Sequence, residues 1–459
     1  MELVLHKSRH VKTLAVLSAF TATLAVAFPA HSEDSIVTTL APAPPVVSSW
    51  EIPNTVHLNP TANRSPAAPK VQAGSAILVD PFTGQTLFAL NPDVRRPHAS
   101  TTKIMTALLV LEHGNLQHRV KAHAGVEKIP TSSLHLKAGE ELSLEDLLYA
   151  VMIRSANDAA VVVARHVGGT EKGFVDMMNA RAQALGMFNT SFKNPNGLHA
   201  QGHYSTAYDL SLLAREAIKN DLFNQIASTR SRTVDRPDSP DKLLLARHRY
   251  LKNYQWADGI KSGYTRQARY CYVGSATRDG QRLISVALRS EDSGGDTIAM
   301  MEYGFNNFKK HDLAEPGAPV VAFTDSSAAP GEFTASPSAP LSVWTAPNAK
   351  QVTLRTEVPA LSYPVRQGER IGSLVAFIDG KPAVRVALLA DQDIQHQPPA
   401  QLGLGSAWMY AALLGILLTI PRVRQVAGIT YGSRRTSLSF VRSRPGLLQT
   451  ILHRGQRHR

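Results

Sequence analysis

The chain of 459 residues contains only one cysteine, Cys271. A single thiol excludes an internal disulfide framework and any zinc or iron–sulfur centre that needs several thiolates. His199 and His203 are spaced four apart, but they lie in a glycine-bearing loop without a helical face or a nearby carboxylate motif. We therefore expect neither a metal nor another cofactor. We expect Cys271 to be buried on a strand as a small apolar residue.

Acidic residues are also scarce, since 36 Asp and Glu against 49 Lys and Arg give a net charge of +13. A balance this basic raises nucleic acid as a partner. The excess is concentrated at the ends, however, because residues 422–459 carry +9 and residues 1–32 carry +2. Residues 33–421 are therefore close to neutral. We expect no nucleic-acid partner, and we expect the nine tail arginines to meet anionic lipid.

Both ends of the chain predict a membrane topology. Residues 1–32 have a basic start, an apolar stretch and a small-x-small cleavage site, which is typical of a secretory signal, with an uncleaved anchor as the alternative. Residues 402–420 carry no charge and would form about 28 Å of helix at about 1.5 Å per residue. The arginine-rich tail, residues 421–459, favours a single transmembrane helix here over a buried core helix, with the tail in the cytoplasm.

The part between the ends divides into three. Residues 41–70 hold seven prolines and little apolar periodicity, which predicts an extended linker over residues 33–70. Two strand patterns around Gly84 then predict a hairpin, and helical patterns follow, so we expect an α/β (α+β) domain over residues 71–308. After a break near residues 325–340, short strands with bends at three glycines predict a β-rich module over residues 309–395, the glycines being Gly368, Gly372 and Gly380.

A serine and a lysine three residues apart begin an apolar helical pattern. Ser100 and Lys103 share one face of this predicted helix, which ends at Gly114. A serine hydroxyl becomes a good nucleophile only when a base takes its proton, and a lysine can do so if burial or positive charge keeps it neutral. The spacing alone is weak, because Ser239 and Lys242 repeat it in a proline-broken loop and because Ser100 can be an ordinary helix cap.

Two further motifs strengthen that interpretation. Ser155-Ala156-Asn157 lies between a helix introduced by the capping box Ser143–Asp146 and a second helix that ends at Gly168-Gly169. Its serine and amide are suited to relaying a proton and orienting a substrate, whereas the plain alternative is a helix–helix turn capped by Asn157.

The third motif, Lys261-Ser262-Gly263, begins an alternating segment that predicts a hairpin turning near Asp279-Gly280. Such a strand edge can hold a peptide by β-augmentation, with Lys261 and Ser262 on its free carboxylate. An edge-strand lysine that prevents aggregation is the plain alternative.

The three motifs occur in the order S-x-x-K, S-x-N, K-[ST]-G, which is the signature of penicillin-binding proteins and class A β-lactamases. Residues 71–308 resemble the low-molecular-mass penicillin-binding proteins, specifically the serine-type D-alanyl-D-alanine carboxypeptidases. Further similar blocks include RRPHASTTKIMTALL and DGIKSGYTRQARYCYVGSATRDG. The resemblance implies a β-lactamase/transpeptidase-like fold with an antiparallel sheet flanked by helices, a β-rich C-terminal domain, and a place in the bacterial cell membrane with the enzyme on the periplasmic side.

The resemblance also implies roles for the motif residues. Ser100 would attack the terminal D-Ala-D-Ala bond of peptidoglycan stem peptides, with Lys103 as the base. Ser155 and Asn157 would complete the proton network, and Lys261 and Ser262 would bind the terminal carboxylate. The remaining implied positions are Gly263 and Tyr264, where the backbone N–H groups of Ser100 and Tyr264 would form the oxyanion hole. β-Lactams would acylate Ser100 as inhibitors.

Three departures from the family pattern concern substrate preference and rate more than the reaction itself. Ser262 replaces the more frequent threonine, Arg269 stands where glycine is common, and Arg247-His248-Arg249 stands near a segment that usually carries asparagines.

Three alternatives remain. One is a D,D-endopeptidase on cross-linked peptidoglycan. The second is a class A-like β-lactamase, which needs a deacylating carboxylate for which Glu216 is the nearest candidate. The third is a catalytically silent cell-wall scaffold.

Overall fold

The computed structural model describes residues 51–61, 64–130, 132–236, 239–246, 249–325 and 327–397. The expected signal over residues 1–32, the transmembrane helix over 402–420 and the tail over 421–459 lie outside this range. Within the described residues, no helix combines the length and apolar character that crossing a bilayer requires.

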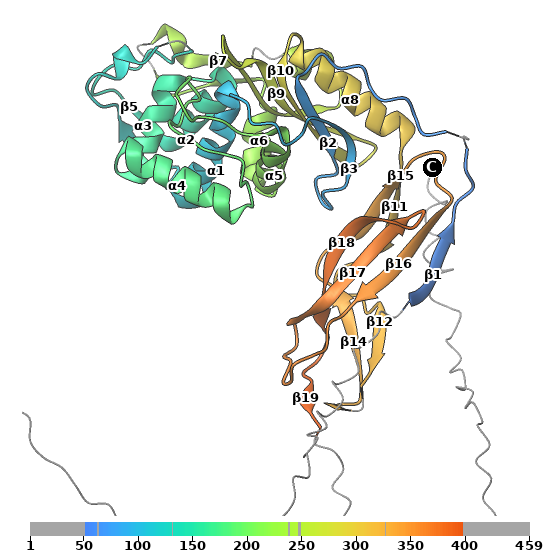
Figure 1. Ribbon diagram of the computed structural model, residues 1–459. Coiled ribbons are helices and arrows are strands. Elements are labelled where there is room, and N and C mark those ends of the chain that lie inside the picture. Colours follow the sequence, from blue (N-terminus) through green and yellow to red (C-terminus); the bar gives the residue numbers. More distant parts are fainter. Residues whose placement is uncertain are drawn as a thin grey trace, which may run out of the picture. The chain divides into compact units, whose positions relative to one another are not determined.

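A five-stranded antiparallel sheet is the centre of the N-terminal half, with strand order β3-β2-β10-β9-β8 (Figure 1). The expected hairpin around Gly84 and the expected turn at Asp279-Gly280 are both confirmed. The K-S-G motif, however, does not begin a single hairpin. It lies inside a further strand at the sheet edge, so the alternating segment forms two consecutive hairpins. The strands are β2 (Ser75–Val79), β3 (Thr86–Leu90), β8 (Ala257–Thr265), β9 (Arg269–Arg278) and β10 (Gln281–Ser290).

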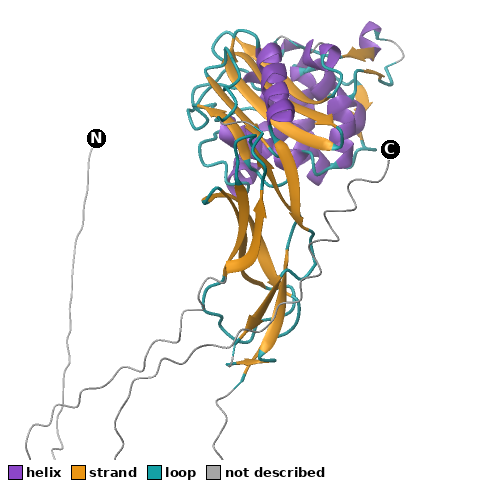
Figure 2. Cartoon of the chain, turned by 90° about the vertical axis from the view of Figure 1, so that its right-hand side faces the viewer, coloured by secondary structure: helices purple, strands orange, loops and turns teal. Residues whose placement is uncertain are grey.

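Helices cover both faces of this sheet. Because side chains alternate along a strand, Ile77 and Val79 pack into the core of the larger helical group, whereas Ala76 and Leu78 pack with Met300 of α8. Figures 1 and 2 show the helices gathered around the sheet. The expected α/β fold is therefore confirmed. The helices are α1 (Lys103–His113), α2 (Leu144–Tyr149), α3 (Asn157–Gly168), α4 (Glu171–Ala184), α5 (Ala207–Ala217), α6 (Asp221–Ser228), α7 (Arg249–Asn253) and α8 (Ser293–Asn307).

Short elements connect the helices and the sheet. Two small two-stranded sheets pair β4 with β5 and β6 with β7. The strands are β4 (Arg119–Lys121), β5 (Glu141–Ser143), β6 (Ser231–Thr233) and β7 (Leu243–Leu245). Single helical turns are η1 (Ala99–Thr102), η2 (Val126–Lys128), η3 (Ala150–Arg154, a π-helix) and η4 (Pro240–Lys242).

The residues from 309 to 397 form strands around a second core, as Figure 2 shows. A six-stranded sheet has the order β1-β16-β17-β18-β14-β12, and β11 pairs with β15 and β13 with β19. The expected break near residues 325–340 instead holds two strands, β13 and β14. Gly372 lies inside β17 rather than at a bend. The strands are β11 (Lys309–Ala314), β12 (Val321–Thr324), β13 (Ala328–Ala329), β14 (Glu332–Pro337), β15 (Leu341–Thr345), β16 (Gln351–Glu357), β17 (Arg370–Ile378), β18 (Lys381–Ala390) and β19 (Gln395–His396).

One strand lies where we expected only linker. Residues Glu51–His57 form β1 and pair antiparallel with β16. Proline density in this stretch indicated an extended linker, because proline cannot donate a ladder hydrogen bond. The register of this pairing shifts between Glu51 and Thr55, and β1 lies at the sheet edge, so a proline-containing segment still adds a strand there.

Candidate active site

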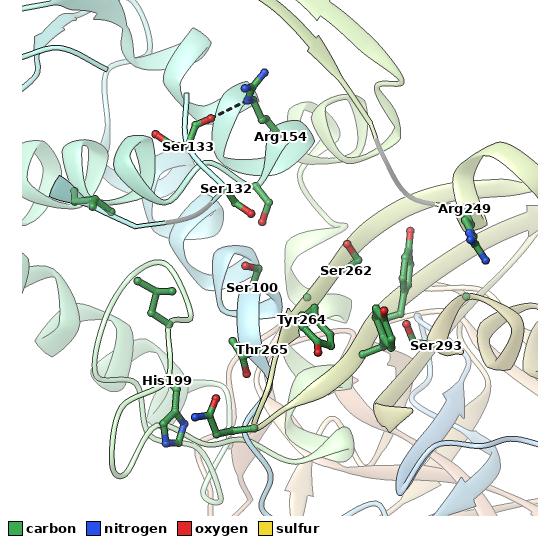
Figure 3. A pocket seen from close by; sticks show the side chains of 18 of the residues that line it. Ser100, Ser132, Ser133, Arg154, His199, Arg249, Ser262, Tyr264, Thr265 and Ser293 are labelled. Atoms are coloured by element: carbon green, nitrogen blue, oxygen red, sulfur yellow. Dashed lines mark hydrogen bonds between the residues drawn. The ribbon is translucent and has the colours of Figure 1, made fainter. Parts of the chain in front are cut away.

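The turn before α1 presents Ser100 to solvent. Ala99 adopts a left-handed backbone conformation (φ 49°) and Ser100 follows it half-buried in η1. The hydroxyl of Thr101 donates to the carbonyl of His98 at 2.7 Å, and the hydroxyl of Thr102 donates to the carbonyl of Ala99 at 2.8 Å. These bonds fix the turn, so Ser100 projects into a cleft of about 1490 Å³ (Figure 3).

Lys103 is fully buried beneath this serine. Its Nζ lies 3.0 Å from Ser100 Oγ, 2.7 Å from Asn157 Oδ1 and 2.5 Å from the carbonyl oxygen of Asn196. Burial lowers the pKa of the Lys103 amine well below its usual value. The charge of Lys261 lowers it further, and Asp158 opposes both. A neutral amine has two N–H donors and one lone pair. The two carbonyl-type oxygens take the donors, which leaves the lone pair for the proton of Ser100.

The S-A-N motif lies between η3 and α3. Asn157 Oδ1 accepts from Lys103, and Asn157 Nδ2 donates to the carbonyl of Pro130 at 3.0 Å. Asn157 is the first residue of α3, and Ala156 occupies the cap position, so the amide orients the lysine instead of capping the helix. Ser155 has a left-handed backbone (φ 61°) and lines the same cleft as Ser100, without a hydrogen bond to Ser100 or Lys103.

The K-S-G motif forms the opposite wall of the cleft, on edge strand β8. Lys261 is fully buried, its Nζ donates to the carbonyl of Ser262 at 3.1 Å, and burial lowers its pKa to about 7. Ser262, Gly263 and Tyr264 line the cleft (Figure 3). A Cβ at Gly263 would lie 2.6 Å from the backbone nitrogen of Ser100, so only glycine allows this close approach.

The loop around Asn196 is the main element that the motifs did not identify. Its carbonyl accepts from Lys103 Nζ, and Ser100 Oγ lies 3.5 Å from the same oxygen. Gly197 (φ 85°) packs against the turn η1, which carries Ser100, so closely that a Cβ would lie 2.1 Å from the carbonyl oxygen of Ala99. The Asn-Pro-Asn-Gly sequence signals a turn, but it carries no signal for this tertiary contact.

Asp158 was also missed, since a carboxylate in the first turn of a helix is ordinary. It is 1% exposed and accepts three hydrogen bonds from a loop that lines the cleft. The donors are Ser133 Oγ at 2.6 Å, the backbone nitrogen of Leu134 at 2.9 Å and that of Leu136 at 3.1 Å. The carboxylate therefore fixes one wall of the cleft next to Asn157.

The other singled-out residues lie as follows. Glu216 binds Arg181 and Lys219, each at 2.7 Å, and does not line the cleft. His203 is buried and bonds Thr102, whereas His199 lines the cleft, and the described residues contain no group of three metal-ligating side chains. Cys271 is buried on β9, as expected. Arg249 lines the cleft, whereas Arg247 and His248 lie outside the described residues.

We predict that Asp158→Asn loosens the loop of residues 132–136. The substitution replaces acceptor oxygens by an amide that opposes N–H donors, and hydrogen bonds to a charged group contribute about 1.5–3 kcal/mol each. Hydrogen exchange at Leu134 and Leu136 should accelerate by about ten-fold or more. Asp209→Asn is the matched control, because Asp209 is also buried near a helix start but binds Asn189 and Thr190. Unchanged exchange at Leu134 and Leu136 would contradict this role.

Comparison with known proteins agrees with this geometry. The family model of D-alanyl-D-alanine carboxypeptidase matches residues 62–292. D-alanyl-D-alanine carboxypeptidase DacF of Bacillus subtilis (strain 168) is 30% identical over 335 residues, covering 71% of this chain and 86% of that protein. D-alanyl-D-alanine carboxypeptidase DacC of Escherichia coli (strain K12) is 29% identical over 355 residues, with 73% and 87% covered.

A solved structure gives the same result. Penicillin binding protein 5 from Haemophilus influenzae matches with a TM-score of 0.64 and 28% identity, covering 72% of this chain and 100% of that chain. The chain therefore belongs to the D-alanyl-D-alanine carboxypeptidase family of serine peptidases.

Proposed function

We propose that this D-alanyl-D-alanine carboxypeptidase removes the terminal D-alanine of peptidoglycan pentapeptides through an acyl-enzyme on Ser100. The observation that carries the proposal is the Lys103 amine, buried and held 3.0 Å from Ser100 Oγ by two other oxygen acceptors. Burial lowers its pKa well below the usual value and so favours the neutral form that a general base requires.

Acylation begins with Ser100 Oγ attacking the carbonyl carbon of the scissile bond while Lys103 Nζ takes the hydroxyl proton. The backbone N–H groups of Ser100 and Tyr264 stabilise the oxyanion, a contribution that is usually large in acyl transfer. Lys261 and Ser262 bind the terminal carboxylate. When the C–N bond breaks, Lys103 returns the proton to the leaving amine through the Ser155 hydroxyl while Asn157 holds the lysine in place, and free D-alanine departs.

Water then hydrolyses the ester on Ser100, with Lys103 again taking the proton. A β-lactam acylates the same serine, because its ring amide occupies the place of the scissile bond and its carboxylate that of the terminal carboxylate. The pairing of Glu216 with Arg181 and Lys219 is consistent with a peptidase that has no separate deacylating carboxylate there.

Labelling with a fluorescent penicillin tests the nucleophile. We expect Ser100→Ala to lose the label and to lose release of D-alanine from a pentapeptide by at least about 10³-fold. Ser239→Ala is the matched control, because Ser239 has the same spacing to Lys242 but its hydroxyl only accepts from the backbone nitrogen of Asp241. Equal labelling of wild type and Ser100→Ala would refute the proposal. Cleavage of cross-linked dimers without D-alanine release would assign an endopeptidase instead.

The two buried lysines predict a bell-shaped pH profile for kcat/KM. The rate constant rises with pH as Lys103 loses its proton, and it falls above about pH 7 as Lys261, with a pKa of about 7, loses the charge that attracts the carboxylate. Lys261→Arg keeps this charge at every working pH, so the alkaline limb should move upward while the acid limb remains. An alkaline limb that stays in place in Lys261→Arg would show that another group titrates there.

We also propose that the chain is exported, anchored by residues 402–420 and active on the periplasmic face of the bacterial cell membrane. The signal-like residues 1–32 and the arginine-rich tail support this topology. Full-length protein should stay in the membrane fraction after a carbonate wash, and a chain ending at residue 401 should appear in the soluble periplasmic fraction. Soluble full-length protein, or membrane-bound truncated protein, would overturn the anchor.

A further inference from the structure

Arg269 occupies a backbone conformation that favours glycine. Its φ is 60°, in the left-handed region, where a side chain costs about 1 kcal/mol relative to glycine. A glycine at this position would avoid that cost. The guanidinium of Arg269 binds Glu291 at 2.8 Å. This ion pair fixes the guanidinium at the start of β9.

Arg269 is one of three arginines around a second hollow of about 620 Å³. Three guanidiniums and one carboxylate line it, the residues being Gln72, Gly74, Arg96, Arg269, Arg289 and Glu291. Arg96 is held in place by Ser75 Oγ at 2.7 Å and the carbonyl of Gly74 at 2.8 Å. Burial lowers the pKa of Arg96, and the charge of Arg289 lowers it further. The hollow therefore has an excess of positive charge.

Of the three arginines, Arg96 and Arg269 are already bound to neighbouring residues, whereas the side chain of Arg289 is available for a ligand. Arg289 is exposed, it also has a left-handed backbone (φ 54°), and its side chain forms no hydrogen bond or ion pair with the residues that the structure describes. A planar guanidinium in this position suits a carboxylate or phosphate, which it can bind through two N–H groups at once.

The hollow adjoins the active-site cleft, because Glu291 lines both. On β8, Thr265 pairs with Arg269 of β9. Thr265 lies three residues after Ser262, which is about 10 Å along the strand. In the proposed function, the substrate's terminal carboxylate lies at Ser262 and its scissile carbonyl at Tyr264. The residues upstream of the scissile bond then extend toward Thr265 and the hollow.

We propose that this basic hollow binds a carboxylate on the stem peptide one or two residues upstream of D-Ala-D-Ala. The proposal rests on the proposed function for the direction of the peptide. Arg289 and Arg269 would bind the carboxylate, with Arg96 as a fixed positive charge behind them. The enzyme would then prefer acidic stem peptides over their neutral amides, a preference that the catalytic residues alone do not provide.

Matched peptides test the proposal. The probes are acetyl-L-glutamyl-D-alanyl-D-alanine and its glutaminyl isostere, together with the same pair extended by one alanine between the acidic residue and D-Ala-D-Ala. At low salt, the wild type should show a kcat/KM about five-fold or more higher for the acidic member of at least one pair. Arg289→Gln should reduce that ratio to about one while leaving the neutral peptide unchanged. Arg269→Gly should reduce the ratio as well.

Arg230→Gln is the matched control, because Arg230 is exposed, forms no side-chain hydrogen bond or ion pair with the described residues and lines neither hollow. It should keep the wild-type ratio. A wild-type ratio of one for both pairs would overturn the proposal. So would an Arg289→Gln variant that keeps the wild-type ratio or that slows the acidic and neutral peptides equally.

Binding to Ser100→Ala separates this proposal from the proposed function. Calorimetry on Ser100→Ala and on Ser100→Ala/Arg289→Gln measures affinity without hydrolysis. If Ser100→Ala binds the acidic peptide more tightly than the neutral one and Ser100→Ala/Arg289→Gln does not, the hollow binds the carboxylate. This conclusion holds even if wild type neither takes the penicillin label nor releases D-alanine. Equal affinities for the acidic and neutral peptides would overturn it, even if wild type is fully active.

Discussion

The arrangement of the active site depends on the three oxygen atoms that surround the buried Nζ of Lys103. Lys103 Nζ meets oxygens from three separate segments: the turn before α1, the first residue of α3, and the loop at Asn196. Three acceptors also suit a protonated amine, which has three N–H donors. In the proposed mechanism, the same three oxygens therefore accommodate the lysine both before and after it takes the proton of Ser100, and the site need not rearrange between the two states.

Two glycines allow the walls of the cleft to approach this centre. Gly263 brings β8 against the backbone nitrogen of Ser100, and Gly197 brings the Asn196 loop against the carbonyl of Ala99. A Cβ at either position would lie well inside contact distance, so backbone would have to move. The turn η1, which carries Ser100, is therefore held between a strand edge and a loop, and its left-handed residue Ala99 is fixed by tertiary packing rather than by local preference.

The sequence predicted the parts of this arrangement that depend on side-chain type and spacing. Ser100 and Lys103 share a helix face, and the turn at Asp279-Gly280 and the helix starting near Asn157 follow local rules. The acceptor at Asn196 could not be predicted, because it is a backbone carbonyl and any residue has one. The pairing of β1 was not predicted either, since Pro53 signals a linker, although a proline is compatible with a strand at a sheet edge, where β1 lies.

Consecutive residues at the start of α3 connect the base to the wall of the cleft. Asn157 binds Lys103 with its oxygen and the carbonyl of Pro130 with its nitrogen, while Asp158 binds the loop of residues 133–136. Both side chains leave the same helical turn. A shift of the loop that moves the start of α3 would therefore also move the amide oxygen that accepts from Lys103. The negative charge of Asp158 raises the pKa of Lys103 and so opposes the effect of burial. The residue that fixes the wall of the cleft therefore also makes the amine more basic than burial alone would leave it.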